Sequence, residues 1–395
     1  MKIREMFFAT TVMLLMISSC ATHKIEAFMP SSKSATEGLV DKNATAGTKA
    51  LFINLKKLSS ENKTMFGQQD ATWYGINADG SLWKDYKDRS DVKSVTGSHP
   101  ALYGWDLQGI VPAKMGFKHS NPLEPDTIKM LVTEAYERGG VNTFSWHMHN
   151  PVTMKNMYDT TPALATLLPG QKNHAHYKQC LDKIAEFFSS LKGKNGELIP
   201  VIFRPFHEHN GNWFWWCKPF CTPQEYKQLI QFTVKYLRDV KGVHNVLYAY
   251  STDKIQDWAD YKERYAGDDY YDILGMDNYW EFKDLKSAPK AIKSLRMVVQ
   301  YALDKNKVPA LTETGLERIT NPNWYTTVLW NSIEADSVTK KIAYLLVWRN
   351  GHLGHFFTPY PGHNSVPDFL RFYNDPHTVF QNDLPDMYKV DEKGK

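Results

Sequence analysis

The sequence lacks an excess of charge of either sign. Its 47 Lys and Arg stand against 43 Asp and Glu, which gives a formal net charge of +4 over 395 residues, and no block of like charges stands out. Electrostatics therefore gives no reason to expect nucleic acid or acidic lipid as a partner, and an uncharged partner is favoured. The composition, 42% hydrophobic and 23% charged, is ordinary for a globular chain and excludes disorder over most of the length.

Long apolar runs are also scarce. The stretch over residues 6–17 follows Lys2 and Arg4 and has the pattern of an export signal. Its end, Ile17-Ser18-Ser19-Cys20, resembles a bacterial lipobox, which implies cleavage before Cys20 and attachment of lipid to its thiol. No later segment is apolar enough to cross a bilayer. We therefore expect an exported lipoprotein that is anchored to a membrane rather than spanning it.

This pattern divides the chain into three parts. Residues 1–20 are the expected signal peptide, which ends at the lipobox cysteine. Residues 21–45 are expected to be a flexible tether, because Ala, Thr, Ser and Lys dominate and no apolar periodicity is present. Residues 46–395 remain for one folded domain. The residues after Cys20 lack the acidic run that resembles surface-export signals of Bacteroides-like bacteria, which favours the periplasmic face over the cell surface.

Cysteine is scarce as well, with four in the chain. If Cys20 carries lipid, Cys180, Cys217 and Cys221 remain in a compartment that permits disulfides. Cys217 and Cys221 bracket a short Lys-Pro-Phe turn, and we expect a disulfide between them to stiffen that loop. A zinc site would need more ligands at suitable spacing than this stretch offers.

Segments typical of strands and of helices alternate along the rest of the chain. Eight short runs rich in β-branched or aromatic residues recur, each followed by polar loop residues and a helix-compatible stretch. The predicted strands are Thr64–Gln69, Ala101–Asp106, Val141–His147, Ile199–Phe206, Asn245–Ser251, Asp272–Asp277, Val308–Glu313 and Ile342–Arg349. The predicted helices are Asp126–Arg138, Tyr177–Leu191, Pro223–Val240, Ala288–Asp304 and Trp324–Ala335. Eight such units, without a second-domain linker, predict a single (β/α)8 TIM barrel of the α/β class.

Acids and aromatics gather at the ends of these runs, where barrel enzymes build their active sites. Aromatic residues make up 13% of the chain, with 12 Trp and 21 Tyr, and many lie beside Asn, His or Asp. This mixture suits a sugar, whose apolar ring face stacks on an indole while its hydroxyls need polar partners. An aromatic-rich core is the alternative. The strand-end sequences are Ser145-Trp146-His147, Arg204-Pro205-Phe206-His207-Glu208, Asp277-Asn278-Tyr279-Trp280, Thr312-Glu313-Thr314-Gly315 and Trp348-Arg349-Asn350.

Glu208 and Glu313 close the fourth and seventh predicted strands, which places them on opposite walls of one pocket. Retaining glycosidases need such a pair, roughly 5–5.5 Å apart, in which one carboxylic acid protonates the departing oxygen and the other attacks the anomeric carbon. Their pKa values must differ. We expect the aromatic loop after Glu208 to keep it protonated, and Arg204 and Tyr279 to keep Glu313 ionised. The strand-end context of both argues against their being ordinary surface residues.

The motifs around these glutamates resemble those of glycoside hydrolase family 26 in clan A. The resemblance is carried by Arg204-Pro205-Phe206-His207-Glu208, by the following Asn210-Gly211-Asn212-Trp213-Phe214-Trp215-Trp216, and by Thr312-Glu313-Thr314-Gly315, and it spans about residues 46 to 390. Most members of the clan carry Asn before the acid/base glutamate. His207 departs from that pattern in the way family 26 does, which strengthens the resemblance.

The resemblance implies roles for the residues around the reacting bond. Glu208 would be the acid/base and Glu313 the nucleophile of a double displacement. His207 would orient the site, and Trp213 would be a stacking platform for the sugar on the leaving-group side.

On the other side of the bond, the resemblance implies that His147 contacts the sugar being attacked and that Trp348 forms the floor beneath it. Tyr279 would steady the nucleophile together with Arg204. Each of these residues has a structural role as the alternative. His147, for example, could be a core histidine whose hydrogen bonds are made within the protein. Trp146, one pleat away from His147, is expected in the core. Trp105 and Asp106 could line distal subsites or merely support the third strand.

The implied activity is that of a retaining endo-β-1,4-mannanase acting on β-mannan, galactomannan or glucomannan, with short products such as mannobiose. The axial 2-hydroxyl of mannose needs a hydrogen-bond partner, which His147 or Asn150 could supply. Activity on mixed-linkage β-glucan or β-1,3-xylan is the alternative within the family. Nothing in the sequence indicates a metal, a nucleotide or another cofactor, and we expect a monomer.

Two other classes compete with this interpretation. A metal-dependent hydrolase is suggested by His147-Met148-His149, His207-Glu208-His209 and His352-Leu353-Gly354-His355. However, the first strand ends in Gln68-Gln69-Asp70 instead of His-x-His, and Glu208 does not lie in an H-E-x-x-H helix. A catalytically silent glycan-binding lipoprotein would keep the aromatics but lose the carboxylate pair, and both glutamates are present.

Overall fold

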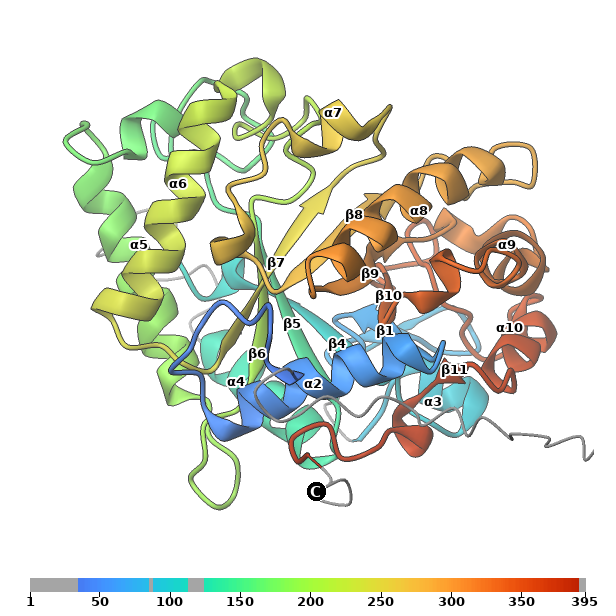
Figure 1. Ribbon diagram of the computed structural model, residues 1–395. Helices are drawn as coiled ribbons and strands as arrows, with labels where there is room; N and C mark the ends of the chain where they lie inside the picture. The colour runs from blue at the N-terminus through green and yellow to red at the C-terminus, as the bar shows by residue number, and fades with distance from the viewer. Residues whose placement is uncertain (1–34, 85–87, 113–123, 391–395) are drawn as a thin grey trace, which may run out of the picture.

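The computed structural model describes residues 35–84, 88–112 and 124–390, and its centre is a closed barrel of parallel strands (Figure 1). The strands follow one another in chain order around the barrel, and the last pairs with the first, Met65 opposite Tyr344. They are β1 (Thr64–Gln69), β4 (Leu102–Asp106), β5 (Val141–Trp146), β6 (Val201–Pro205), β7 (Val246–Thr252), β8 (Ile273–Asn278), β9 (Val308–Thr314) and β10 (Tyr344–Val347). The predicted (β/α)8 TIM barrel is confirmed, and each strand overlaps its predicted run.

Helices cover the outside of the barrel. Those at predicted positions are α4 (Glu124–Glu137), α5 (His174–Ser190), α6 (Pro223–Lys235) and α8 (Ala288–Asp304). Apolar residues spaced one helical turn apart form a buried face on α8. They are Ala291, Leu295, Val298 and Ala302. The predicted helix over residues 324–335 consists of a π-helical turn and α9 (Asn331–Glu334). Short elements that were not predicted are β2 (Gly75–Ile76), β3 (Leu82–Trp83), α3 (Asp91–Thr96), α7 (Trp258–Lys262), α10 (Val366–Tyr373) and β11 (Thr378–Val379).

An additional helix, α2 (Ala46–Ser60), closes the end of the barrel where the strands begin (Figure 1). Its N-terminus is capped by Thr45, whose hydroxyl accepts from the amide of Thr48. Its apolar side chains Leu51, Phe52, Leu55 and Leu58 are buried against the first residues of the strands. Each such burial contributes about 1.5–3 kcal/mol, so α2 is a substantial part of the core.

The chain is already folded before α2. Leu39 and Val40 are buried, and the amide of Val40 donates to Asp272 Oδ1 at 2.7 Å. Asp41 Oδ2 lies 2.7 Å from His244 Nδ1. Residues 39–41 therefore belong to the folded domain, and the predicted tether over residues 21–45 extends too far toward the C-terminus. Their side chains and backbone contact residues at the end of the barrel where the strands begin. The predicted signal peptide and Cys20 lie outside the described residues.

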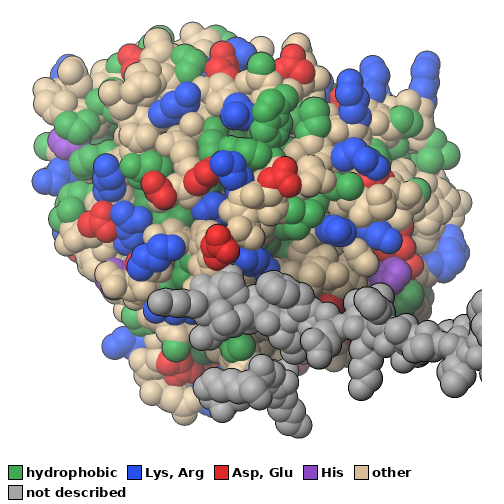
Figure 2. Space-filling view, viewed as in Figure 1, with side chains coloured by type: hydrophobic (Ala, Val, Ile, Leu, Met, Phe, Trp, Pro, Cys, Tyr) green, Lys and Arg blue, Asp and Glu red, His purple; other side chains and the backbone are tan. Residues whose placement is uncertain are grey.

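The surface carries charges of both signs. On the face drawn in Figure 2, Lys and Arg side chains are interspersed with Asp and Glu, in line with the small net charge. Within the described ranges, no helix combines the length and the apolar character needed to span a bilayer.

Candidate active site

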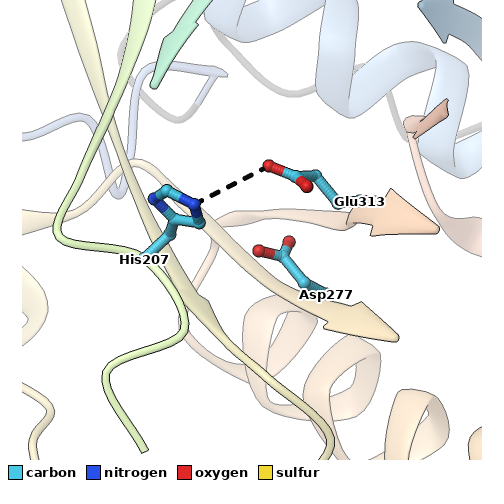
Figure 3. A group of neighbouring side chains, drawn as sticks. All are labelled: His207, Asp277 and Glu313. Atoms are coloured by element: carbon cyan, nitrogen blue, oxygen red, sulfur yellow. Dashed lines mark ion pairs between the residues drawn. The ribbon is translucent and has the colours of Figure 1, made fainter. Parts of the chain in front are cut away.

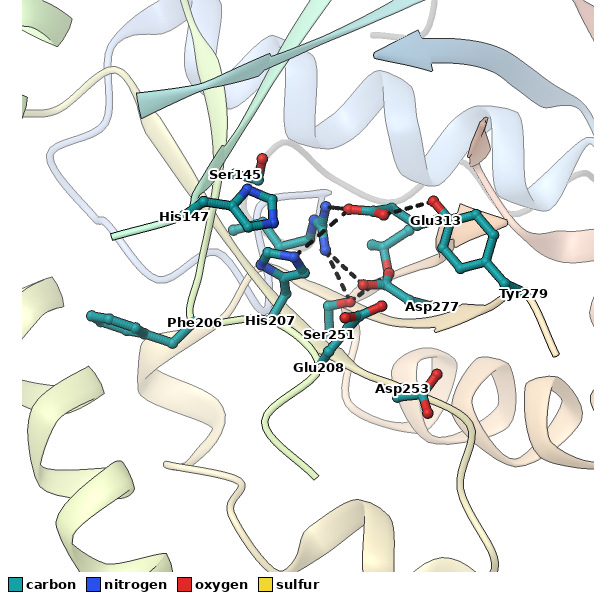
Figure 4. A network of polar contacts seen from close by, with 12 residues as sticks. Ser145, His147, Phe206, His207, Glu208, Ser251, Asp253, Asp277, Tyr279 and Glu313 are labelled. Carbon is teal, nitrogen blue, oxygen red and sulfur yellow. Dashed lines mark hydrogen bonds and ion pairs between the residues drawn. The ribbon is translucent and has the colours of Figure 1, made fainter. Parts of the chain in front are cut away.

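Three buried charged residues meet where the strands end. Arg204 on β6 donates from Nη1 to Asp277 Oδ2 at 2.8 Å, and its Nη2 contacts Glu313 Oε1 (Figure 4). Burial disfavours the charge of Arg204, but the carboxylates of Asp277 and Glu313 outweigh it and raise its pKa. Burial raises the pKa of Asp277 to about 7, although Arg204 opposes the shift. A permanent cation thus holds Glu313 in place.

The register of β9 helps to place Glu313. Between Leu311 and Thr314 the strand carries one more residue than either neighbour. Met276 pairs with Leu311 and the next residue of β8 with Glu313, while the pairing with β10 shifts over the same stretch. An extra residue of this kind breaks the alternation of a strand and redirects a side chain. The shift lies directly at Glu313.

The second carboxylate oxygen of Glu313 is also held. Tyr279, after β8, donates its hydroxyl to Oε2 at 2.7 Å. The sequence predicts both the Tyr279 and the Arg204 contact. With a donor on each oxygen, the orientation of the Glu313 carboxylate is fixed.

Glu208 has a different environment. Its Oε2 accepts a hydrogen bond from Trp213 Nε1 at 2.7 Å. Burial raises the pKa of Glu208 well above its usual range, and the negative charges of Asp277, Glu313 and Asp253 add to this, while the bond from Trp213 opposes it. The surroundings of Glu208 therefore favour its protonated form, whereas both oxygens of Glu313 accept hydrogen bonds from Arg204 and Tyr279.

The turn after β6 positions Glu208 through its backbone. Phe206 and Glu208 have φ angles of 52° and 54°, in the left-handed region that bulky residues seldom adopt. The amide of Glu208 donates to the carbonyl of Ser251 at 3.0 Å. Three side chains donate to the consecutive carbonyls of residues 206, 207 and 208 over 2.9, 2.8 and 3.3 Å, and these are Tyr226, Trp216 and Cys217.

The predicted disulfide between Cys217 and Cys221 is wrong, because both are free thiols. Cys217 Sγ points to the carbonyl of Glu208, and Cys221 Sγ to the carbonyl of Trp216, each at 3.3 Å. Burial raises the pKa of Cys217 to about 12, so this thiol stays protonated and able to donate. The two side chains support the loop separately instead of bridging it.

His147 faces the site from the end of β5. Its Nδ1 lies 2.5 Å from Asp106 Oδ2, which also accepts from Ser145. Burial lowers the pKa of His147, but the carboxylate of Asp106 outweighs this and the pKa is raised. Because Asp106 occupies Nδ1, Nε2 is left for a ligand. Asp106 thus supports the third barrel strand and its histidine.

Of the tryptophans near the site, two are buried in the core and two are partly exposed. Trp146 and Trp105 are buried, as a supporting role requires, and Trp105 donates to Asn142 Oδ1 at 2.8 Å. Trp348 and Trp213 are partly exposed, and the ring of Trp348 lies 5.8 Å from that of His147, edge to face.

Asn150, the other predicted partner for the 2-hydroxyl, is committed to its own loop. Its amide donates to the carbonyls of Asp159 and Thr161, and its oxygen accepts from the amides of Val152 and Thr153. Both hydrogens and both lone pairs are used, so Asn150 has no capacity left for a sugar.

His207 lies between His147 and Glu313. Its ring centre is 4.7 Å from that of His147, and its Nε2 is 4.0 Å from Glu313 Oε1 (Figure 3). Burial lowers the pKa of His207 well below its usual range, and the positive charge of Arg204 adds to the effect. His207 is therefore a neutral neighbour.

A metal-dependent site is not favoured by these contacts. His207, Asp277 and Glu313 have the ligand types of a metal site and approach within 4.8 Å of one another. However, the guanidinium of Arg204 already binds both carboxylates, and its charge would repel a metal ion. His209 is not part of the group, because its ring packs on Tyr226 and is neutral.

Two further acids belong to the site. The sequence indicates Asp277 at a strand end without a role for it, and Asp253 was not predicted. Asp277 binds Arg204, and Asp253 adds negative charge beside Glu208. Both end a buried strand or directly follow one, which is the signal that identified the glutamates.

Comparison with known proteins shows the family of this chain. Residues 40–353 match the model of glycosyl hydrolase family 26. A mannan endo-1,4-beta-mannosidase of Bifidobacterium adolescentis is 35% identical over 92% of this chain, which spans 38% of that relative's length.

Solved structures resemble the whole barrel. GH26C from Muricauda sp. is 37% identical, with a TM-score of 0.85 over 92% of this chain and 99% of that one. A GH26 beta-mannanase from Bacteroides ovatus is 39% identical, with a TM-score of 0.81 over 88% and 98%. The barrel, the paired glutamates and the matched family model lead to one conclusion: this chain belongs to glycoside hydrolase family 26.

Proposed function

We propose that the protein is a retaining endo-β-1,4-mannanase in which Glu208 is the acid/base and Glu313 the nucleophile. The observation that carries the proposal is the division between the two carboxyls. Glu208 is buried among negative charges, which raises its pKa, whereas Glu313 accepts hydrogen bonds from the cation Arg204 and from Tyr279. Retaining glycoside hydrolysis requires this division.

In the first step, Glu313 attacks the anomeric carbon while Glu208 gives its proton to the glycosidic oxygen. The carbon–oxygen bond breaks, the leaving sugar departs with the proton, and an ester joins the remaining sugar to Glu313. In the second step, ionised Glu208 takes a proton from water, the water oxygen attacks the anomeric carbon, and the ester bond breaks. Arg204 and Tyr279 hold the carboxylate of Glu313 when it leaves.

Mannan is the substrate that we propose for this chemistry. The Bifidobacterium relative and the Bacteroides ovatus structure carry mannanase names. His147 supports the choice, because its free Nε2 can bond the axial 2-hydroxyl of a mannose in the attacked position. Galactomannan and glucomannan are included, because their main chains also contain β-1,4-linked mannose. Mixed-linkage β-glucan and β-1,3-xylan are the alternative substrates within the family.

The product profile tests this function. We would incubate the residue 21–395 protein with unsubstituted β-1,4-mannan and, in parallel, with mixed-linkage β-glucan and β-1,3-xylan. Release of short manno-oligosaccharides such as mannobiose, abolished in Glu313→Gln, is the expected result. Cleavage confined to glucan or xylan would overturn the substrate and keep the mechanism. Binding to mannan without cleavage would favour a glycan-binding protein.

We further propose that the protein works as a monomer held at the membrane by lipid on Cys20, on the periplasmic face. The support is the lipobox-like Ile17-Ser18-Ser19-Cys20 after an apolar stretch. Incorporation of labelled palmitate into the wild type, but not into Cys20→Ser, is expected. Equal labelling of both would contradict the anchor. Size-exclusion chromatography of the residue 21–395 protein tests the monomer.

A further inference from the structure

A groove continues from the site beyond Glu208. It has a volume of about 690 Å³, within the range of about 300–1,000 Å³ found for small-molecule sites. It begins at Trp213, the residue that bonds Glu208, and runs to the first turns of α8. Its walls are formed by residues 210–213, residues 253–256, and Lys290, Lys293 and Ser294 of α8. The groove therefore lies on the side from which the general acid would protonate a leaving group.

Asp253 lines this groove, directly after β7. The side chain of Asn210 ties the two walls together. Its oxygen accepts from the amide of Asp253 at 2.7 Å, and its amide group donates to the carbonyl of Lys254 at 3.0 Å. This clamp joins the loop that carries Glu208 to the loop that carries Asp253. Figure 4 shows both residues, and the negative charge of Asp253 acts on Glu208.

The carboxyl of Asp253 is buried but lacks a matching donor. The residue is 5% exposed, and within the described part of the chain no side chain donates a hydrogen bond to its carboxylate, which meets the backbone amide of Lys254 alone. Burial raises its pKa to about 6. Because Asp253 lines the groove, the unused acceptor positions of its carboxylate are open to a donor that enters there.

We propose that Asp253 is a specificity residue for the leaving-group side. Its carboxylate accepts a hydrogen bond from a hydroxyl of the first leaving sugar, whose chain continues along the groove toward α8. This inference rests on the proposed function, because it assumes that Glu208 protonates a sugar leaving group. A sugar hydroxyl is the neutral donor that this position lacks, and it can reach the carboxylate while its ring lies against Trp213.

Asp253 also acts on Glu208 through its charge. The groups that face Glu208 are Asp253 directly after β7, Asp277 on β8 and Glu313 on β9, together with Trp213. Asp253 itself is faced by Lys254, Glu281 and Asp260. Removing the charge of Asp253 removes one of three negative neighbours of Glu208, so the pKa of Glu208 falls and its proton is lost at lower pH.

The test compares two substrates in Asp253→Ala and Asp253→Asn. Mannotetraose has a sugar leaving group, whereas 4-nitrophenyl β-mannobioside releases a phenol that has no sugar hydroxyls and needs little protonation. We expect kcat/KM for mannotetraose to fall about tenfold to a hundredfold in Asp253→Ala, which corresponds to one hydrogen bond to a charged group. For the aryl substrate we expect a change within about twofold, which also shows that the variant is folded. Asp269→Asn, which removes the same charge at the opposite end of the barrel, is the matched control and should leave both values unchanged.

The pH profile separates this role from a structural one. In Asp253→Asn, the alkaline limb of kcat/KM for mannotetraose is expected to move to lower pH. Equal losses on both substrates, or no loss on mannotetraose, would overturn the inference while leaving the proposed function intact. An unmoved alkaline limb would overturn the action on Glu208. A wild type that cleaves neither substrate would instead overturn the proposed function, and the inference with it.

Discussion

Tyr279 donates its hydroxyl to the Oε2 atom of Glu313 over 2.7 Å, while Arg204 holds the other oxygen. Tyr279→Phe removes one donor and keeps the ring. Because a hydrogen bond to a charged group contributes about 1.5–3 kcal/mol, kcat on mannan is expected to fall about tenfold to a hundredfold. Steady-state kinetics checks this, with Tyr270→Phe, far from the site, as the control. Unchanged kcat in Tyr279→Phe would show that the contact does not serve catalysis.

The bond from Trp213 to Glu208 gives a prediction about pH. This bond opposes the rise in the pKa of Glu208, because it stabilises the charged form. In Trp213→Phe the pKa of Glu208 therefore rises further, and the acid keeps its proton to higher pH. We expect the alkaline limb of the kcat/KM profile to move to higher pH while the aromatic platform remains. A shift in the opposite direction would refute this assignment of the acid.

Helix α2 is predicted to stabilise the barrel from below. Leu55 is fully buried in the cluster that closes the barrel, whereas Lys57 on the same helix is exposed. Leu55→Ala leaves a cavity and is expected to lower the free energy of unfolding by about 2–5 kcal/mol. Lys57→Ala should change it by no more than about 0.5 kcal/mol. Urea unfolding of both variants measures the difference, and similar values for the two would contradict a core role for α2.

The free thiols of the active-site loop can be counted directly. The residue 21–395 protein is unfolded without reductant and treated with a coloured disulfide-exchange reagent. We expect three thiols per chain to react, those of Cys180, Cys217 and Cys221. One reactive thiol per chain would instead show that Cys217 and Cys221 form the disulfide. Cys217→Ser, which keeps a donor to the carbonyl of Glu208, is expected to retain more activity than Cys217→Ala.

Much of the barrel follows from local pattern. The predicted bounds of β1 and α8 agree with the structure at both ends, because β-branched runs and a one-face helical pattern are local signals. Helix α2 was not predicted, although Leu51, Leu55 and Leu58 recur at helical spacing. The polar residues before it are similar to those of a tether. The buried pairing of Val40 with Asp272 joins residues far apart in sequence and leaves no local pattern.

In the site as well, some features follow from the local sequence and others depend on the folded structure. The motifs indicated Glu208, Glu313 and their neighbours, because these residues lie at strand ends in recognisable runs. The sequence could not show that Asn150 is consumed by its own loop, or that Cys217 donates to the carbonyl of Glu208. Both facts depend on side-chain directions in three dimensions. Asp253 was not predicted, because it lies in the polar loop after the fifth barrel strand, outside the recognised motifs.

The central claim is that Glu313 forms a covalent bond with the sugar. Incubation with a 2-deoxy-2-fluoro-mannobiosyl fluoride, followed by digestion and mass spectrometry, tests it directly. The fluorine at C2 slows both steps, but the anomeric fluoride is a good leaving group that keeps the first step fast, so the ester accumulates. We predict one added mannobiosyl group per chain, on the peptide containing Glu313 at that residue, and none in Glu313→Gln. Turnover of mannan with inversion at the anomeric carbon, or a label on any other residue, would contradict the account.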